Sequence, residues 1–212
     1  MDRCAFLFDL DGVIFDTEGQ YSVLWNALGQ KYFSDSDFAW KIKGQTLSGI
    51  FSAYFPDNEA ARKDVRAALA RFEREMDYSY VPGAREFIEE LRSRKFYSAI
   101  VTSSDRSKME NVYMAHPEIK GMFSRIFTGE DFPRSKPYPD CYLLGMKTAG
   151  AAPEDTFIFE DSFNGLQAAK DSGGNVIALA TTNPREKVAP YASLVADDFT
   201  AISLDALLQM SR

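Results

Sequence analysis

Two aspartates, Asp9 and Asp11, follow an apolar run that ends at Phe8 in the segment FLFDLDGVIFD. An aspartate carboxylate can attack phosphorus, exchange protons with a reacting oxygen, or hold a cation. Charge at the end of a core strand is costly unless other groups compensate for it. The rest of the sequence therefore has to supply partners for these two carboxylates.

Polar side chains also follow three later segments of the chain. Thr102 and Ser103 follow the apolar run 97–101, Lys136 lies in a loop after residues 125–128, and Glu160 and Asp161 end the run 156–160. In an open α/β sheet, ligands bind at the carboxyl ends of the strands. We therefore expect four carboxylates, one ammonium group and a hydroxyl cluster to meet at one edge.

Clustered carboxylates repel each other unless a cation joins them. Oxygen ligands without His or Cys favour a hard ion, and Mg²⁺ is the ion that we expect here. The only histidine is His116, too few for a His-dependent triad or a zinc site built on several His ligands. A metal together with Lys136 could neutralise phosphoryl oxygens, and Thr102 could donate to one of them.

The elements that must position these residues alternate from residue 84 onward. A nearly all-apolar run such as 4–8 is typical of a central parallel strand covered on both faces. Predicted strands span 4–8, 97–102, 125–128, 156–160, 175–179 and 194–198. Predicted helices span 84–94, 105–115, 139–149, 163–172 and 203–210. This alternation predicts an α/β fold with a parallel sheet.

Residues 17–79 do not follow this alternation of strands and helices. The segments 18–33, 46–55 and 58–76 all have helical patterns, and the segment is far longer than a crossover needs. We therefore predict a helical domain at 17–79, inserted into a core domain formed by 1–16 and 80–212. Its predicted core consists of Leu24, Trp25, Leu28, Ile50, Phe51, Leu69 and Phe72.

Composition limits the partners of the chain. It has 212 residues and a formal net charge of −7, which disfavours binding to the phosphates of nucleic acids. Cys4 and Cys141 are too few for a disulfide framework, and we expect both to be reduced. The sequence shows neither a signal peptide nor a membrane-spanning apolar stretch. We expect a cytoplasmic protein with no membrane partner.

Four segments occur together in a specific order: DLDGV, VTSS, SKPYPD and FEDSFNG. In this order they resemble the four motifs of the haloacid dehalogenase superfamily. The helical insertion behind the first motif is similar to the cap domain of its β-phosphoglucomutase-like branch. The resemblance covers nearly the whole chain and implies a doubly wound, Rossmann-like core with an all-helical cap.

The resemblance implies roles for the first motif. Asp9 would be the nucleophile and a metal ligand, forming an aspartyl-phosphate. Asp11 would be the general acid and base, with its backbone carbonyl on Mg²⁺.

The other motifs would complete the site. Thr102 and the backbone of Ser103 would hold phosphoryl oxygens, and Lys136 would bridge the phosphoryl group and the nucleophile. Asp161 would bind the metal, and Glu160 would either bind it or support its ligands.

The cap would select the leaving group, and the residues that we expect to contact it are Thr17, Glu18, Tyr21, Lys43 and Gln45. Mutases of the β-phosphoglucomutase type carry a cap His where this chain has Tyr21. They carry a cap Arg where it has Leu47. A mutase needs to bind a second phosphate, so both differences weigh against that activity.

A Mg²⁺-dependent phosphatase acting on a small phosphorylated metabolite, such as a sugar phosphate, is the function that we predict. The alternatives are a sugar-phosphate mutase, an inorganic pyrophosphatase and a non-catalytic phosphate-binding protein. By analogy with proteins that have caps of this size, we expect a monomer.

Overall fold

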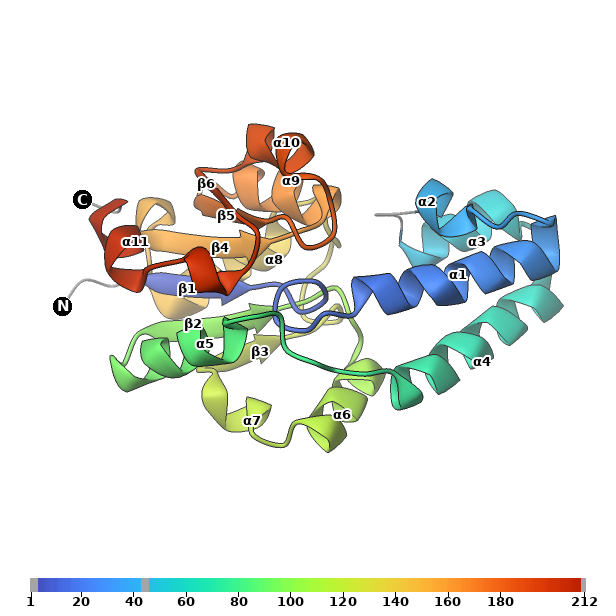
Figure 1. Cartoon of the computed structure of the whole chain (residues 1–212), viewed down its shortest axis with the longest axis horizontal. Helices are drawn as coiled ribbons and strands as arrows, with labels where there is room; N and C mark the ends of the chain where they lie inside the picture. Colours follow the sequence, from blue (N-terminus) through green and yellow to red (C-terminus); the bar gives the residue numbers. More distant parts are fainter. Residues whose placement is uncertain (1–3, 43–45, 211–212) are drawn as a thin grey trace. The chain divides into compact units, whose positions relative to one another are not determined.

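The computed structural model describes residues 4–42 and 46–210. Six parallel strands form one sheet in the order β3-β2-β1-β4-β5-β6 (Figure 1). Their bounds are Ala5–Phe8 (β1), Tyr97–Val101 (β2), Arg125–Phe127 (β3), Thr156–Glu160 (β4), Asn175–Leu179 (β5) and Leu194–Ala196 (β6). The chain winds from β1 to one side and then returns to the other, so the predicted doubly wound α/β fold is confirmed.

The two faces of the central strands carry different side chains. Phe6 stacks on Phe157 of β4 with ring centroids 5.2 Å apart, and Phe8 stacks on Phe159 at 4.5 Å. Both pairs are directly opposite in the register of β1 and β4. Leu7 points to the other face, where it belongs to an apolar cluster. Both faces are buried, which explains why the strand sequences are apolar throughout.

Helices complete this part of the chain. The α-helices span Ala84–Ser93 (α5), Arg106–Ala115 (α6), Ile119–Met122 (α7), Asp140–Ala149 (α8), Phe163–Asp171 (α9), Arg185–Val188 (α10) and Leu204–Met210 (α11). Short 3₁₀-helices span Pro153–Asp155, Ala189–Tyr191 and Phe199–Ala201. The five longer α-helices were predicted. The one-turn helices α7 and α10 are too short to show a helical period.

Capping residues begin two of the helices shortly after the chain leaves a strand. The Asp105 carboxylate accepts a hydrogen bond from the backbone N–H of Lys108 at 2.8 Å, which starts α6. The Ser162 hydroxyl accepts from the N–H of Gly165 at 3.2 Å, which starts α9. Such caps satisfy donors that have no partner inside the helix.

The chain divides into two compact units, which we call the sheet unit (1–16 and 78–212) and the helical unit (17–77). The second boundary falls two residues before the predicted one. The helical unit consists of Glu18–Phe33 (α1), Phe38–Ile42 (α2), Leu47–Tyr54 (α3) and Glu59–Glu75 (α4). Helix α2 was not predicted, because a five-residue helix shows too little periodicity.

The core of the helical unit differs from the predicted one in part. Leu28, Ile50 and Phe51 are buried in its apolar cluster as expected. The cluster also contains Phe38 and Phe55, which the prediction omitted. In the described residues, no helix combines the length and apolarity needed to span a membrane.

Candidate active site

Strand β1 places Asp9 at the carboxyl edge of the sheet. The backbone N–H of Asp9 donates to the carbonyl of Phe159 at 3.0 Å, which extends the strand pairing by one residue. The residue is 9% exposed. A buried carboxylate in this position needs a cationic or hydrogen-bonding partner.

Lys136 is that partner, and it comes from the long loop between β3 and α8. Its ammonium group donates to the Asp9 Oδ1 and to Glu160 Oε1, each at 2.6 Å. A third hydrogen bond reaches the carbonyl of Val101 at 3.1 Å. The three donors of the ammonium group are thus directed at the ends of β1, β2 and β4. The sequence prediction that these strand ends converge on Lys136 agrees with this geometry.

Glu160 is fully buried and accepts hydrogen bonds at both carboxylate oxygens. Besides Lys136, Oε1 accepts from the Tyr142 hydroxyl at 2.7 Å. Oε2 accepts from the N–H of Asp161 at 3.1 Å and from the N–H and hydroxyl of Ser162 at 3.3 and 3.2 Å. These bonds fix the carboxylate against Lys136. Tyr142 is a site residue that the sequence reasoning missed, although it lies close behind the Lys136 motif.

Three carboxylates form a group that could hold a metal ion. Asp9, Glu160 and Asp161 each offer an oxygen, and these oxygens lie within 4.8 Å of one another. An all-oxygen group of this kind suits a hard divalent cation. Asp11, the fourth carboxylate expected at this edge, is not in the group.

The charges in the site affect one another. The pKa of Asp9 is raised to about 7, chiefly by burial, even though the Lys136 ammonium acts to lower it. Burial acts to lower the pKa of Lys136, but the carboxylates of Asp9 and Glu160 outweigh it and keep the ammonium charged. A divalent cation at the group would favour ionised Asp9.

Gly12 makes room for the side chain of Asp161. It adopts a left-handed conformation with φ of 75°, and a Cβ at this position would lie 2.1 Å from Asp161 Oδ2. The Thr181 hydroxyl donates to the carbonyl of Gly12 at 2.6 Å, and the Asn183 amide donates to the carbonyl of Asp161 at 2.8 Å. Thr181 and Asn183 were missed. Their position just after β5 is the signal that could have identified them.

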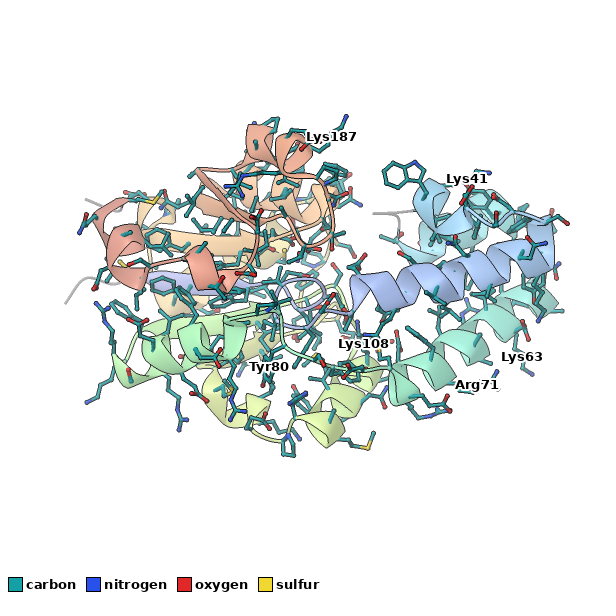
Figure 2. The ribbon with its side chains drawn as sticks, viewed as in Figure 1. Lys41, Lys63, Arg71, Tyr80, Lys108 and Lys187 are labelled. Atoms are coloured by element: carbon teal, nitrogen blue, oxygen red, sulfur yellow. The ribbon has the colours of Figure 1, made fainter. Side chains whose placement is uncertain are left out.

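Asp11 lies against two donors from the segment after β2. The Ser104 hydroxyl donates to Asp11 Oδ2 at 3.2 Å, and the Lys108 ammonium forms an ion pair with the same oxygen. Lys108 is buried in the first turn of α6 (Figure 2). The sequence analysis includes Ser104 in the motif VTSS but assigns it no role. Lys108 was missed, because it carries no local signal.

Thr102 and Ser103 differ in their surroundings. Thr102 is 1% exposed, and its hydroxyl accepts from the N–H of Ser104 at 3.0 Å. Its own N–H donates to the carbonyl of Phe127 at 3.1 Å, which holds it at the end of β2. Ser103 is exposed.

The candidates for substrate selection lie in the helical unit. Thr17 is buried just before α1, Glu18 begins that helix, and the Tyr21 hydroxyl donates to Glu73 at 3.0 Å. Lys43 and Gln45 lie outside the described residues. Leu47, at the position of the mutase Arg, begins α3 and is 36% exposed.

The arrangement of these residues agrees with a comparison against known families. A family model described as haloacid dehalogenase-like hydrolase matches residues 6–179. The chain belongs to this family. The match includes Asp9, Thr102, Lys136 and Asp161, and the predicted family membership is confirmed.

Curated relatives in this family include named phosphatases. The chain is 29% identical over 178 residues to the phosphorylated carbohydrates phosphatase of Thermotoga maritima, covering 80% of this chain and 81% of that protein. It is 26% identical over 212 residues to a mitochondrial (DL)-glycerol-3-phosphatase of Arabidopsis thaliana, covering 94% of this chain and 70% of that protein.

The fold is also that of a solved mutase. The structure superposes on β-phosphoglucomutase of Clostridium difficile with a TM-score of 0.78 at 20% identity, covering 98% of this chain and 96% of that chain. This similarity shows the fold, so it supports the predicted β-phosphoglucomutase-like architecture without bearing on the choice between mutase and phosphatase.

Proposed function

We propose that this protein is a Mg²⁺-dependent phosphomonoesterase that removes phosphate from a small phosphorylated metabolite. The observation that carries this proposal is the buried group in which Lys136 joins Asp9 and Glu160 beside Asp161. Membership of the hydrolase family and the named phosphatases among the relatives support it.

The net negative charge of the site favours the binding of a divalent cation. When they are ionised, Asp9, Asp11, Glu160 and Asp161 outnumber the ammonium groups of Lys136 and Lys108 by two charges. Asp9, Asp161 and the backbone carbonyl of Asp11 would hold the Mg²⁺, and Glu160 would either bind it or orient Lys136. When bound, Mg²⁺ neutralises negative charge that develops on the phosphoryl oxygens.

In the first step, a carboxylate oxygen of Asp9 attacks phosphorus and the ester P–O bond breaks, which forms an aspartyl-phosphate. Asp11 gives its proton to the departing oxygen, so that the product leaves as an alcohol. Lys136, the Thr102 hydroxyl and the backbone of Ser103 hold the phosphoryl oxygens. Lys136 would exchange one present acceptor, such as the Val101 carbonyl, for a phosphoryl oxygen.

In the second step, water attacks phosphorus and gives its proton to the Asp11 carboxylate. The bond between phosphorus and the Asp9 oxygen breaks, which releases inorganic phosphate and restores the Asp9 carboxylate. Asp11 then carries the proton needed for the next first step. The two aspartates thus have separate tasks, which a non-catalytic phosphate-binding protein would not need.

The helical unit would act as the cap that selects the leaving group, and 1–16 with 78–212 would form the catalytic core. Sugar and polyol phosphates are the substrates that we favour, because relatives named for phosphorylated carbohydrates and glycerol 3-phosphate belong to this family. Thr17, Glu18, Tyr21, Lys43 and Gln45 remain the proposed cap contacts.

The enzyme would act in the cytoplasm as a monomer. The chain has two cysteines, Cys4 and Cys141, which are too few for a disulfide framework, and this suits a reducing compartment. We propose no contact with membranes or nucleic acids.

The test is a panel of phosphate esters containing sugar phosphates, glycerol 3-phosphate, p-nitrophenyl phosphate and pyrophosphate, assayed with Mg²⁺ and again with a chelator. We expect phosphate release from monoesters, loss of release with chelator, and no measurable release by Asp9→Asn. Asp171→Asn, an exposed aspartate of α9, is the matched control. Isomerisation of β-glucose 1-phosphate faster than its hydrolysis would show a mutase instead, and no release from any ester would refute the proposal.

A further inference from the structure

We propose that Lys108 is a positioning residue that, together with Ser104, holds the carboxylate of Asp11 in the orientation needed for proton transfer. The inference rests on the proposed function, in which Asp11 exchanges protons with the leaving oxygen and with water. It extends that function to a lysine that lies outside all four motifs recognised in the sequence.

The burial of Lys108 is the first observation. The residue is 4% exposed. Lysine side chains are rarely buried unless their charge is paired. The Lys108 ammonium pairs with Asp11 Oδ2, and the Asp11 side chain is 17% exposed. Ordering and desolvating a lysine in this way is expensive, so a surface role does not explain it.

The place of Lys108 in α6 is the second observation. It is the third residue of the helix, where the helix dipole disfavours a positive charge. Arg106 is in the same turn, which contains no acidic residue. The stability of α6 therefore does not account for a cation here. The hydrogen bond from the Lys108 N–H to Asp105 fixes the backbone from which the side chain extends.

The convergence of two donors is the third observation. The Ser104 hydroxyl, at 3.2 Å, and the Lys108 ammonium bind the same oxygen of Asp11. The backbone of Ser104 is itself held by the Thr102 hydroxyl. Two donors on one carboxylate oxygen restrict the rotation of the side chain about both of its torsions. The segment 102–108 thus links the proposed phosphoryl ligand Thr102 to the orientation of Asp11.

The effect of losing Lys108 on the rate of cleavage depends on the leaving group. A general acid must lie within hydrogen-bond reach of the oxygen that it protonates, and it contributes roughly 10²–10⁴-fold to the rate. An alkyl phosphate needs this proton, because an alkoxide is a poor leaving group. A p-nitrophenolate ion leaves readily without it. Loss of Lys108 should therefore harm the cleavage of alkyl esters much more than that of p-nitrophenyl phosphate.

The experiment measures kcat/KM, which covers the steps up to departure of the leaving group, for Lys108→Met and the wild type. The substrates are p-nitrophenyl phosphate and the primary-alkyl phosphate that the wild type hydrolyses fastest. We expect a fall of roughly 10²-fold or more for the alkyl ester, within the range of general acid catalysis, and a much smaller fall for the aryl ester. Lys108→Arg should recover part of the loss, and the exposed Lys187→Met is the matched control (Figure 2).

A double variant tests whether Lys108 acts through Asp11. Asp11→Asn and Asp11→Asn/Lys108→Met should have the same kcat/KM for the alkyl ester, because Lys108 then has no carboxylate to orient. If Lys108→Met fails to fold, Ser104→Ala removes the other donor and should show the same substrate dependence with a smaller loss.

Equal losses on both substrates, or additive effects in the double variant, would overturn the inference while leaving the phosphatase intact. A wild-type protein without any phosphatase activity would instead refute the proposed function, so the two failures are distinguishable.

Discussion

Lys136 of the sheet unit and Lys31 of the helical unit each pair with a carboxylate at close to the same distance. Lys136 lies 2.6 Å from Asp9 and Lys31 lies 2.7 Å from Asp64. The Lys136 side chain is 5% exposed and that of Lys31 is 55% exposed. The two pairs therefore differ strongly in burial, and Lys136 also pairs with a second carboxylate, that of Glu160.

The difference shows which charges are costly to keep. A buried ion pair must repay the loss of hydration of both groups, and it often contributes no net stability. An exposed pair costs little and contributes little. The buried charges of the sheet unit are costly to fold and are therefore expected to serve a chemical function. The exposed pairs of the helical unit remain hydrated, so they need no such function.

The largest contrast should come from removing the two lysines in turn. Lys136→Met leaves Asp9 and Glu160 buried without their cation, and this should lower the free energy of unfolding by about 3–5 kcal/mol. It should also lower kcat by roughly 10²–10³-fold, as expected when one donor to a reacting oxyanion is lost. Lys31→Met should leave both quantities close to wild type, because its pair is solvated.

Urea denaturation followed by circular dichroism, together with phosphate release, measures both effects. Without added Mg²⁺ the loss of stability should be largest, since no other cation compensates the two carboxylates. If Lys31→Met were as harmful as Lys136→Met, burial would not be the feature that distinguishes the two units.

A smaller contrast should come from two glycines. In the sheet unit, a Cβ at Gly165 would lie 1.8 Å from Glu160 Oε1, so Gly165→Ala must displace the carboxylate that holds Lys136. We expect a loss of about 1–3 kcal/mol in stability and up to about 10²-fold in kcat. In the helical unit, a Cβ at Gly19 meets no atom within 4 Å, and Gly19→Ala in α1 should stabilise by up to about 1 kcal/mol.

Thermal unfolding and steady-state kinetics of both variants are sufficient for this comparison. A Gly165→Ala enzyme with normal kcat would mean that the position of Glu160 has little influence on the reaction.

The smallest effect should appear at acidic pH in the helical unit. Hydrogen bonds from Lys31 and Tyr32 lower the pKa of Asp64. Because the pKa is lower in the folded state, this stabilisation is present above the pKa of the unfolded chain and is lost as the pH falls through the folded value. Asp64→Asn should thus be slightly less stable than wild type at pH 6, and the difference should shrink towards pH 3.

Fluorescence of Trp25 and Trp40 follows this effect, because both tryptophans of the chain lie in the helical unit. The exposed Asp57→Asn serves as the control. A difference that stays constant from pH 6 to pH 3 would show that the Asp64 carboxylate charge is not responsible.

The sequence was sufficient to predict the sheet and most of the group at its edge. Apolar runs mark buried parallel strands, and polar residues directly after such runs must meet at one edge. This reasoning found Asp9, Lys136, Glu160 and Asp161, because each stands at or near the end of a strand or in a recognisable motif.

The residues that it missed have no such local signal. Lys108 lies in a helix whose pattern resembles any amphipathic surface helix, and its burial results from tertiary packing against Asp11. In the sequence, Tyr142 looks like an ordinary core residue, and only the structure shows that its hydroxyl donates a hydrogen bond to Glu160. Both residues contact partners that are far away in the sequence. Such contacts arise from the three-dimensional fold, and the spacing of residues along the chain does not reveal them.

Attack of the Asp9 side chain on phosphorus leaves a covalent intermediate that can be trapped. The experiment quenches the enzyme during turnover of p-nitrophenyl phosphate with Mg²⁺, reduces it with borohydride, and maps the modified peptide by mass spectrometry. Reduction converts an aspartyl-phosphate to homoserine, and we expect this change at residue 9 in the presence of substrate and not in its absence. Homoserine at another aspartate, or none in an enzyme that is turning over under conditions where the intermediate accumulates, would contradict attack by Asp9.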